Sequence, residues 1–260
     1  MRTLVVNADD FGFTREVNQG IIEAHQRGIL TATTLMACGA AFDDAVRLAR
    51  ENPTLDVGCH LVLVGEPPYP PTVSKLIPAA MLGRIKIYDE FASQTRKIID
   101  AGIKLTHLDT HKHTHILPPV LDAVARVSEE FRIPWVRRPF DFDALPGGVK
   151  WVNRGMGIMR GRFARVLESR GCRSTDHFSG FGVTGNYTAQ YLIDLIRALP
   201  EGSTEFMCHP GRCGPELRAA RTRLKDSREQ ELNALTDPAV RAELESSGVR
   251  LGNYAELSRG

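Results

Sequence analysis

The stretch TLVVNADDFGFTREVNQGIIEAHQRG, residues 3–28, contains one complete strand–loop–helix unit. Its first part, Thr3–Ala8, is apolar and rich in β-branched residues, which is typical of a buried strand. Thr14 can cap a helix, and apolar residues then recur with helical spacing from Val17 until Gly28. This stretch therefore predicts a β-strand followed by an α-helix.

The same alternation of strand and helix recurs along the chain. We predict further strands at 32–37, 55–61, 104–109, 134–137 and 204–208, and further helices at 42–50, 90–101, 118–131 and 188–199. Repeated βα units form parallel sheets, and about six to eight of them favour closure into a barrel. We therefore expect an α/β fold in which residues 1–260 form a single barrel domain.

Two segments depart from this alternation. Residues 65–87 carry five prolines, and we interpret them as an excursion over the active face, with an ordinary irregular loop as the alternative. Residues 216–247 are charged and helical, and Asp237 with Pro238 begins a new helix there. We expect this tail to pack on the outside of the barrel.

The composition excludes several classes of protein. The chain has 33 Lys and Arg against 31 Asp and Glu, which is no basis for binding nucleic acid. The apolar run at Leu4–Val6 is too short for a signal peptide or a membrane span, so we expect a cytoplasmic protein. Five cysteines without a C-x-x-C pair argue against a disulfide framework and indicate buried free thiols.

Polar residues at the carboxyl ends of strands are the candidates for chemistry, because ligands of parallel α/β folds collect there. They are Asn7, Asp9, Asp10, His60, His107, Asp109, His111, His113, His115 and His209. Adjacent carboxylates repel unless a cation or proton lies between them, and neutral imidazoles suit a divalent metal. The alternatives are a helix cap for the aspartates, satisfied core residues for His60 and His209, and an adventitious metal-binding patch for the histidine run.

The histidine run HLDTHKHTH, residues 107–115, has its four histidines and Asp109 at odd positions. Any extended portion of the run would therefore present them on one face. Asp109 is a candidate to orient one of the imidazoles.

Four motifs together resemble the YdjC-like, or ChbG-like, carbohydrate deacetylase family. They are NADDFG (7–12), GxHL (58–61), THLDTHKHxH (106–115) and CHP (208–210), in the order of the family and over nearly the whole chain. The stretch HLVLV (60–64) and the neighbourhood of CHP are most similar to the hopanoid-biosynthesis-associated branch of the family.

This resemblance implies a distorted (β/α) barrel, laid out like the polysaccharide deacetylases, that hydrolyses the acetamide of an N-acetylglucosamine-type sugar. Asp10, His60 and His111 match the metal ligands of the family, Asp9 its general base and His209 its general acid. Phe11, His113 and His115 would line the site or contact the substrate. The cofactor would be one divalent ion, either zinc, magnesium or another transition metal.

A lipid-linked sugar such as a hopanoid glycoside would fit residues 150–173, where arginines alternate with apolar side chains. Such a segment suits an interfacial helix on the inner face of the membrane, although we favour an ordinary outer helix with a solvated basic face. A homodimer is the default expectation for assembly.

Two other functions compete with a deacetylase. A metal-dependent phosphoesterase or cyclic-amide hydrolase would use the same scaffold, but such enzymes usually need two metals. A non-catalytic barrel that binds sugar or metal would have no use for the carboxylate of Asp9 beside the ligands.

Overall fold

The computed structural model describes residues 1–141 and 157–258, which are built around a curled parallel sheet. The strands are β1 (Arg2–Phe11), β2 (Ala32–Leu35), β3 (Asp56–Leu61), β4 (His107–Thr110), β5 (Trp135–Val136), β6 (His177–Ser179), β7 (Gly202–Cys208) and β8 (Arg250–Gly252). Their order is β5-β4-β3-β2-β1-β7-β6, and β8 pairs with the first half of β1.

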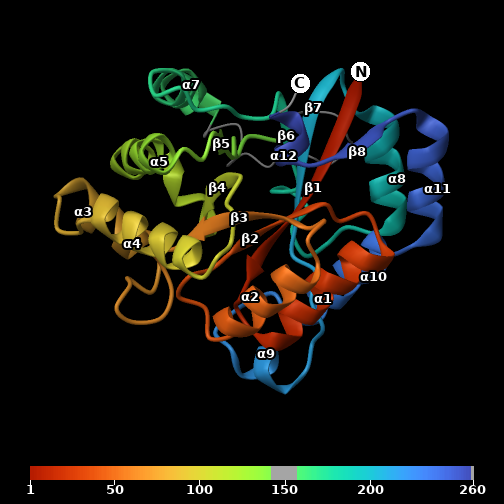
Figure 1. The fold of residues 1–260 in the computed structure, drawn as a ribbon, viewed down its shortest axis with the longest axis horizontal. Helices are drawn as coiled ribbons and strands as arrows, with labels where there is room; N and C mark the ends of the chain where they lie inside the picture. Colours follow the sequence, from red (N-terminus) through yellow and green to blue (C-terminus); the bar gives the residue numbers. More distant parts are fainter. Residues whose placement is uncertain (142–156, 259–260) are drawn as a thin grey trace.

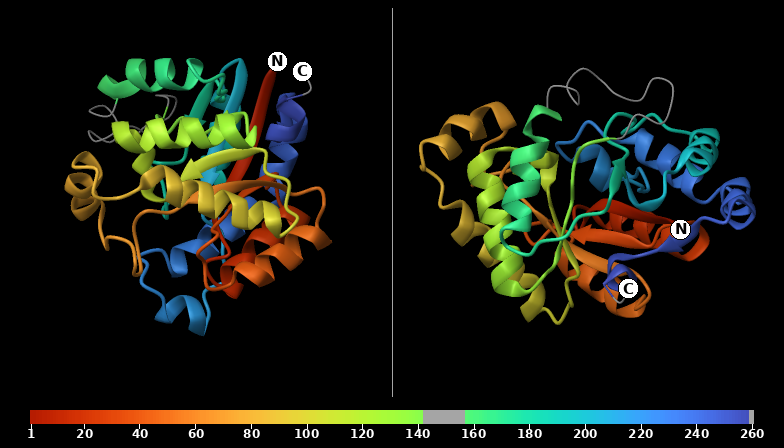
Figure 2. Two further views of the ribbon diagram at one scale, coloured as in Figure 1. Left: turned by 60° about the vertical axis from the view of Figure 1, so that its left-hand side comes forward. Right: turned by 90° about the horizontal axis from the view of Figure 1, so that it is seen from above.

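The two ends of this sheet are joined by backbone bridges. Trp135 pairs with Arg173, and Asp141 pairs with Phe178 of β6, both in parallel. Seen from above, the strands fan out around one centre with helices outside them (Figure 2). The expected distorted α/β barrel is therefore confirmed.

Helices cover the outside of the sheet (Figure 1). They are α1 (Arg15–Arg27), α2 (Phe42–Glu51), α3 (Val73–Met81), α4 (Ile87–Asp100), α5 (Pro118–Phe131), α7 (Arg160–Glu168), α8 (Ala189–Ala198), α9 (Pro215–Ala219), α10 (Asp226–Leu235), α11 (Pro238–Ser247) and α12 (Tyr254–Leu257), with 3-10 turns at His111–Ile116 and Gly157–Met159.

The expected caps and apolar faces explain why these elements form. The Thr14 hydroxyl accepts a hydrogen bond from the backbone N–H of Val17 at 3.2 Å, and Asp237 caps α11. Val17 and Ile21 of α1 are fully buried in the hydrophobic core. Every residue of β1 from Thr3 to Phe11 is buried, because helices cover the outer face of the sheet while side chains fill its interior.

For the proline-rich segment, the alternative of an ordinary irregular loop is wrong. Residues 65–87 contain a helix, α3, which lies at the periphery of the molecule beyond α4 and α5 (Figure 1). The side chain of Leu76 anchors this helix, because it is fully buried. The start of the segment approaches the loop after α9, where Glu66 Oε1 lies 3.7 Å from Arg221 Nε, and its passage over the active face stays a prediction. The short strands β6 and β8 were also not predicted, because three residues are too few for a periodic pattern.

The basic segment at 150–173 is an outer helix in the part that the structure describes; residues 150–156 lie outside the described ranges. Phe163 and Leu167 of α7 are buried in the core, and Arg162 Nη2 lies 3.6 Å from Asp122 Oδ2 of α5. None of the helices in the described ranges is both long and apolar enough to cross a bilayer.

The five cysteines are all free. Cys59, Cys172 and Cys208 are buried as expected, whereas Cys38 is exposed and Cys213 is half-buried.

Candidate active site

Asp9 and Asp10 point in different directions because the backbone turns sharply at the end of β1. Asp10 has a φ of 69°, in the left-handed region that aspartate tolerates better than most residues. The pairing of β1 with β2 also shifts register between Ala8 and Phe11. As a result, Asp9 faces Arg137 and His209, while Asp10 faces His60 of β3 and His111 at the start of the 3-10 turn after β4.

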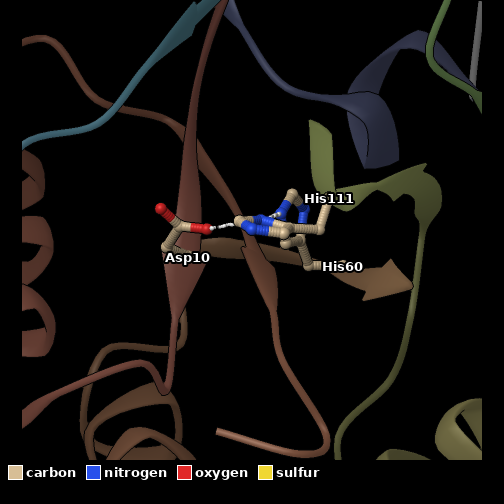
Figure 3. Close-up of side chains that lie close together, drawn as sticks. All are labelled: Asp10, His60 and His111. Atoms are coloured by element: carbon tan, nitrogen blue, oxygen red, sulfur yellow. Dashed lines mark hydrogen bonds and ion pairs between the residues drawn. The ribbon is translucent and has the colours of Figure 1, made fainter. Parts of the chain in front are cut away.

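Asp10, His60 and His111 converge on one point (Figure 3). Asp10 Oδ1 lies 3.4 Å from His60 Nε2 and 3.2 Å from His111 Nδ1, and the two nitrogens are 3.2 Å apart. Ligands about 2.0–2.2 Å from one tetrahedral ion are separated by roughly 3.3 Å, so this triangle has the size of a metal site. Asp10 Oδ1 is buried and accepts no hydrogen bond from the described residues, as suits an atom that coordinates an ion.

The second ring nitrogen of His60 is held by a carboxylate. Asp109 Oδ1 lies 2.7 Å from His60 Nδ1, and Asp109 Oδ2 accepts a hydrogen bond from the Thr34 hydroxyl at 3.1 Å. This contact turns Nε2 toward the triangle, as is usual for a metal-binding imidazole. Burial opposes a charge on His60, but Asp109 and Asp10 together hold its pKa well above its ordinary value.

Arg137 binds three carboxylates from three strands. Its guanidinium lies 2.6 and 2.7 Å from the two oxygens of Asp9, 2.6 Å from Asp109 Oδ2 and 2.7 Å from Glu205 Oε1. Burial raises the pKa of Asp9, but Arg137, together with His60 and His209, outweighs burial and holds this pKa well below its ordinary value. Asp9 is therefore an ionised carboxylate at neutral pH.

The site as a whole has an excess of negative charge. Within the described residues it buries five carboxylates and two guanidinium groups, namely Asp9, Asp10, Asp109, Glu205 and Glu231 against Arg137 and Arg228. Burial raises the pKa of Glu205 although Arg137 opposes this, and even without Glu205 the carboxylates outnumber the arginines. Buried charge needs a counter-charge, which a divalent cation or a protonated His60 can provide.

His209 follows β7 and lies on the other side of Asp9. Its Nε2 is 3.8 Å from Asp9 Oδ2, and its Nδ1 is buried without a hydrogen bond from the described chain. Burial lowers the pKa of His209. The nearby carboxylate of Asp9 raises this pKa, but not enough to bring it back to its ordinary value. The backbone N–H of His209 donates to Glu231 Oε2 at 2.5 Å.

The remaining histidines of the fourth strand separate. Only His107–Thr110 is extended; Lys112 and His113 then take left-handed conformations in a 3-10 turn, so the histidines do not share one face. His113 is buried edge-on to Phe178 and Phe181, and its Nδ1 lacks a hydrogen bond from the described residues.

Three of the strand-end and motif residues, His107, His115 and Phe11, are buried and engaged with other groups of the core. His107 Nε2 contacts Asn7 Oδ1 at 2.9 Å, and the His107 ring stacks on Tyr254. His115 Nε2 lies 3.0 Å from the Arg137 carbonyl. Phe11 is fully buried in the hydrophobic core.

Four charged residues were missed by sequence reasoning. Arg137 ends a predicted strand and could have been found by the rule that selected the other strand-end residues. Glu205 is an acid directly before the apolar residues Phe206, Met207 and Cys208 of a strand, which is a signal in itself. Arg228 and Glu231 lie in a charged helix, where nothing distinguishes them from solvated residues.

Comparisons with known proteins agree with the family resemblance of the four sequence motifs. The family model described as YdjC-like protein matches residues 3–246. A chitooligosaccharide deacetylase of Klebsiella pneumoniae is 33% identical over 98% of this chain and 99% of its own, and a carbohydrate deacetylase of Brevibacillus brevis is 31% identical over 98% and 99%. A crystal structure from Enterococcus faecalis, provisionally described as a cellobiose-phosphate cleavage protein, superposes with a TM-score of 0.77 at 24% identity and covers 98% of both chains.

Proposed function

This chain belongs to the YdjC-like protein family, and we propose that it hydrolyses the acetamide of an N-acetylglucosamine-type sugar with the help of one divalent ion. The observation that carries this proposal is the triangle of Asp10 Oδ1, His60 Nε2 and His111 Nδ1, whose sides measure 3.2–3.4 Å, beside the ionised carboxylate of Asp9. The deacetylase relatives supply the substrate class.

The residues present fit such an ion. Asp10, His60 and His111 would hold it, because they offer one carboxylate oxygen and two imidazole nitrogens around a common point. This ligand set suits zinc, iron, cobalt or nickel, and also magnesium or manganese if water completes the shell. When bound, the ion supplies Lewis acidity, which polarises a carbonyl and acidifies water for a base as weak as Asp9.

In the proposed reaction, Asp9 acts as the general base and His209 acts as the general acid. Asp9 accepts a proton from the attacking water, because Arg137 keeps it ionised and fixes both of its oxygens. His209 is largely neutral in the resting site, since burial lowers its pKa. It receives a proton on the side of Asp9, 3.8 Å away, and delivers it to the leaving amine.

A second metal is disfavoured by the position of Arg137. Asp9, His60 and Asp109 form another cluster with the size of a metal site. However, the Arg137 guanidinium lies within 2.7 Å of oxygens from both aspartates and already supplies the positive charge there. This arrangement favours a one-metal amide hydrolase over a phosphoesterase or cyclic-amide hydrolase with two ions.

Release of free amine from N-acetylglucosamine conjugates tests the proposal, with and without chelator. We expect one tightly bound ion per chain and activity that chelator abolishes and metal restores. Asp9→Asn should keep the ion but lose about a hundredfold or more in rate, whereas His111→Ala should lose both. Two bound ions per chain, full activity in Asp9→Asn, or amine release that resists chelation would contradict it.

We also propose, as finer points, a hopanoid-linked substrate, peripheral membrane contact, a cytoplasmic location and a homodimer. The basic side chains of α7 support membrane contact, whereas burial of Phe163 and Leu167 leaves that helix few apolar side chains for a lipid surface. Co-sedimentation with anionic vesicles tests the contact, and protein that stays in the supernatant would exclude it.

A further inference from the structure

We infer that helix α10, which lies outside the barrel, positions both halves of the catalytic site through Arg228 and Glu231. This inference rests on the proposed function and assigns a role to two residues that are remote in sequence from the motifs. The two side chains are three residues apart, so they lie on the same face of the helix. Both side chains are 1% exposed. Charged side chains are seldom buried so deeply unless they are paired, so the partners of these two residues indicate what they do.

Arg228 engages one oxygen of the metal-binding aspartate. Its Nη2 donates to Asp10 Oδ2 at 2.5 Å, while the other oxygen, Asp10 Oδ1, faces His60 and His111. The guanidinium is itself fixed, because its Nε donates to the carbonyl of Leu224 at 3.3 Å. Asp10 is therefore presented to an ion through one oxygen only.

This restriction has a chemical consequence. A carboxylate with both oxygens free can bind an ion through two atoms, which fills a coordination position that the reaction needs open. Arg228 also withdraws negative charge from Asp10, so the ion keeps more of its Lewis acidity. Arg228 is thus a positioning residue that acts through Asp10.

Glu231 fixes the turn that carries His209. Its Oε2 accepts from the backbone N–H of His209 at 2.5 Å, and its Oε1 accepts from the backbone N–H of Gly185 at 2.7 Å. The carbonyl of Arg228 accepts from the N–H of Gly211 at 3.2 Å in the same turn. Glu231 therefore ties the loop after β6 to the turn after β7, and so sets the position of the His209 ring relative to Asp9.

The contact of Arg228 with Asp10 and the contacts of Glu231 with the backbone predict different effects of substitution on bound Co²⁺. The visible bands of Co²⁺ weaken and shift when its coordination number rises. We expect Arg228→Met to bind one Co²⁺ per chain with altered bands and a kcat lowered at least about tenfold at nearly constant KM. Arg228→Lys, which keeps a charge beside Oδ2, should largely restore both the bands and kcat.

Glu231→Gln has one acceptor oxygen for two N–H groups and should lower kcat while leaving the Co²⁺ bands unchanged. Asn233→Ala is the matched control, because Asn233 is exposed on the same helix. Unfolding curves establish that each variant is folded, and Arg228→Gln replaces Arg228→Met if the latter is not.

Unchanged Co²⁺ bands in the neutral Arg228 variant would overturn the role of Arg228, and unchanged kcat in Glu231→Gln would overturn that of Glu231. Asp10→Asn separates these failures from a failure of the proposed function. If Asp10→Asn binds Co²⁺ as the unaltered protein does, or neither binds it, the metal site itself is wrong. If Asp10→Asn alone weakens Co²⁺ binding, the proposed metal site is supported. The roles of Arg228 and Glu231 are then decided by the Co²⁺ bands and kcat of their own variants.

Discussion

Gly20 lies in the middle of α1, where replacement by alanine would ordinarily stabilise a helix by about 0.5–1 kcal/mol. We predict the opposite here. A Cβ at Gly20 would lie 2.4 Å from the Cα of Gly211 and 2.7 and 2.8 Å from its carbonyl carbon and nitrogen. Carbon atoms in contact are normally about 3.5–4.0 Å apart, so the backbone would have to move by about 1 Å.

The magnitude follows from these opposing effects. Overpacking of this kind costs about 1–3 kcal/mol, so Gly20→Ala should destabilise the protein by up to about 2 kcal/mol after the gain in helix propensity. Gly211 lies two residues after His209, and a 1 Å displacement of a catalytic group can cost about a hundredfold in rate. We therefore expect a large loss of kcat together with a modest loss of stability.

Urea unfolding and amine release measure the two effects. Gly161→Ala is the matched control, because Gly161 is a glycine of helix α7 with nothing within 4 Å of the added Cβ. It should be neutral or stabilising by up to about 1 kcal/mol and leave kcat unchanged. The reasoning would be refuted if Gly20→Ala stabilised the protein as much as Gly161→Ala and kept full activity.

Three further predictions follow from the buried charges and caps. Arg137→Met leaves buried carboxylates without their partner and should lower the free energy of unfolding by at least about 3–5 kcal/mol; a loss below about 1 kcal/mol in urea titrations would contradict this. Burial holds the pKa of His115 at about 3 against 6.5 when unfolded, so the unfolded chain binds the extra proton and stability falls as pH drops below about 6.5. His115→Gln should flatten that decline by up to about 1.4 kcal/mol per pH unit between pH 6.5 and 3, and an equally steep decline would show that His115 is not its source. Thr14→Ala should cost about 1 kcal/mol through loss of the cap on α1, measured by thermal unfolding, with no change in kcat.

The sequence alone indicated the parallel α/β architecture of this protein and a set of candidate site residues, from which the family resemblance selected Asp10, His60 and His111 as metal ligands. Strand and helix periodicities are local, so most units from Thr3 to Cys208 could be assigned without knowledge of the fold, although the three residues of β6 were too few to form a pattern. The strand-end rule then selected Asp9, Asp10, His60 and His209 because all parallel strands present their carboxyl ends at one rim.

Only the tertiary structure decided which charges surround those residues. Arg137 meets Asp9 across 128 positions of sequence, and Arg228 meets Asp10 across 218. The end of a predicted strand marks Arg137 as a candidate, but no local pattern reports which carboxylate it meets, and the neighbours of Arg228 in sequence do not distinguish it from a solvated arginine. The path of the chain after Thr110 was likewise decided by two left-handed residues, Lys112 and His113, which direct the histidines to different places.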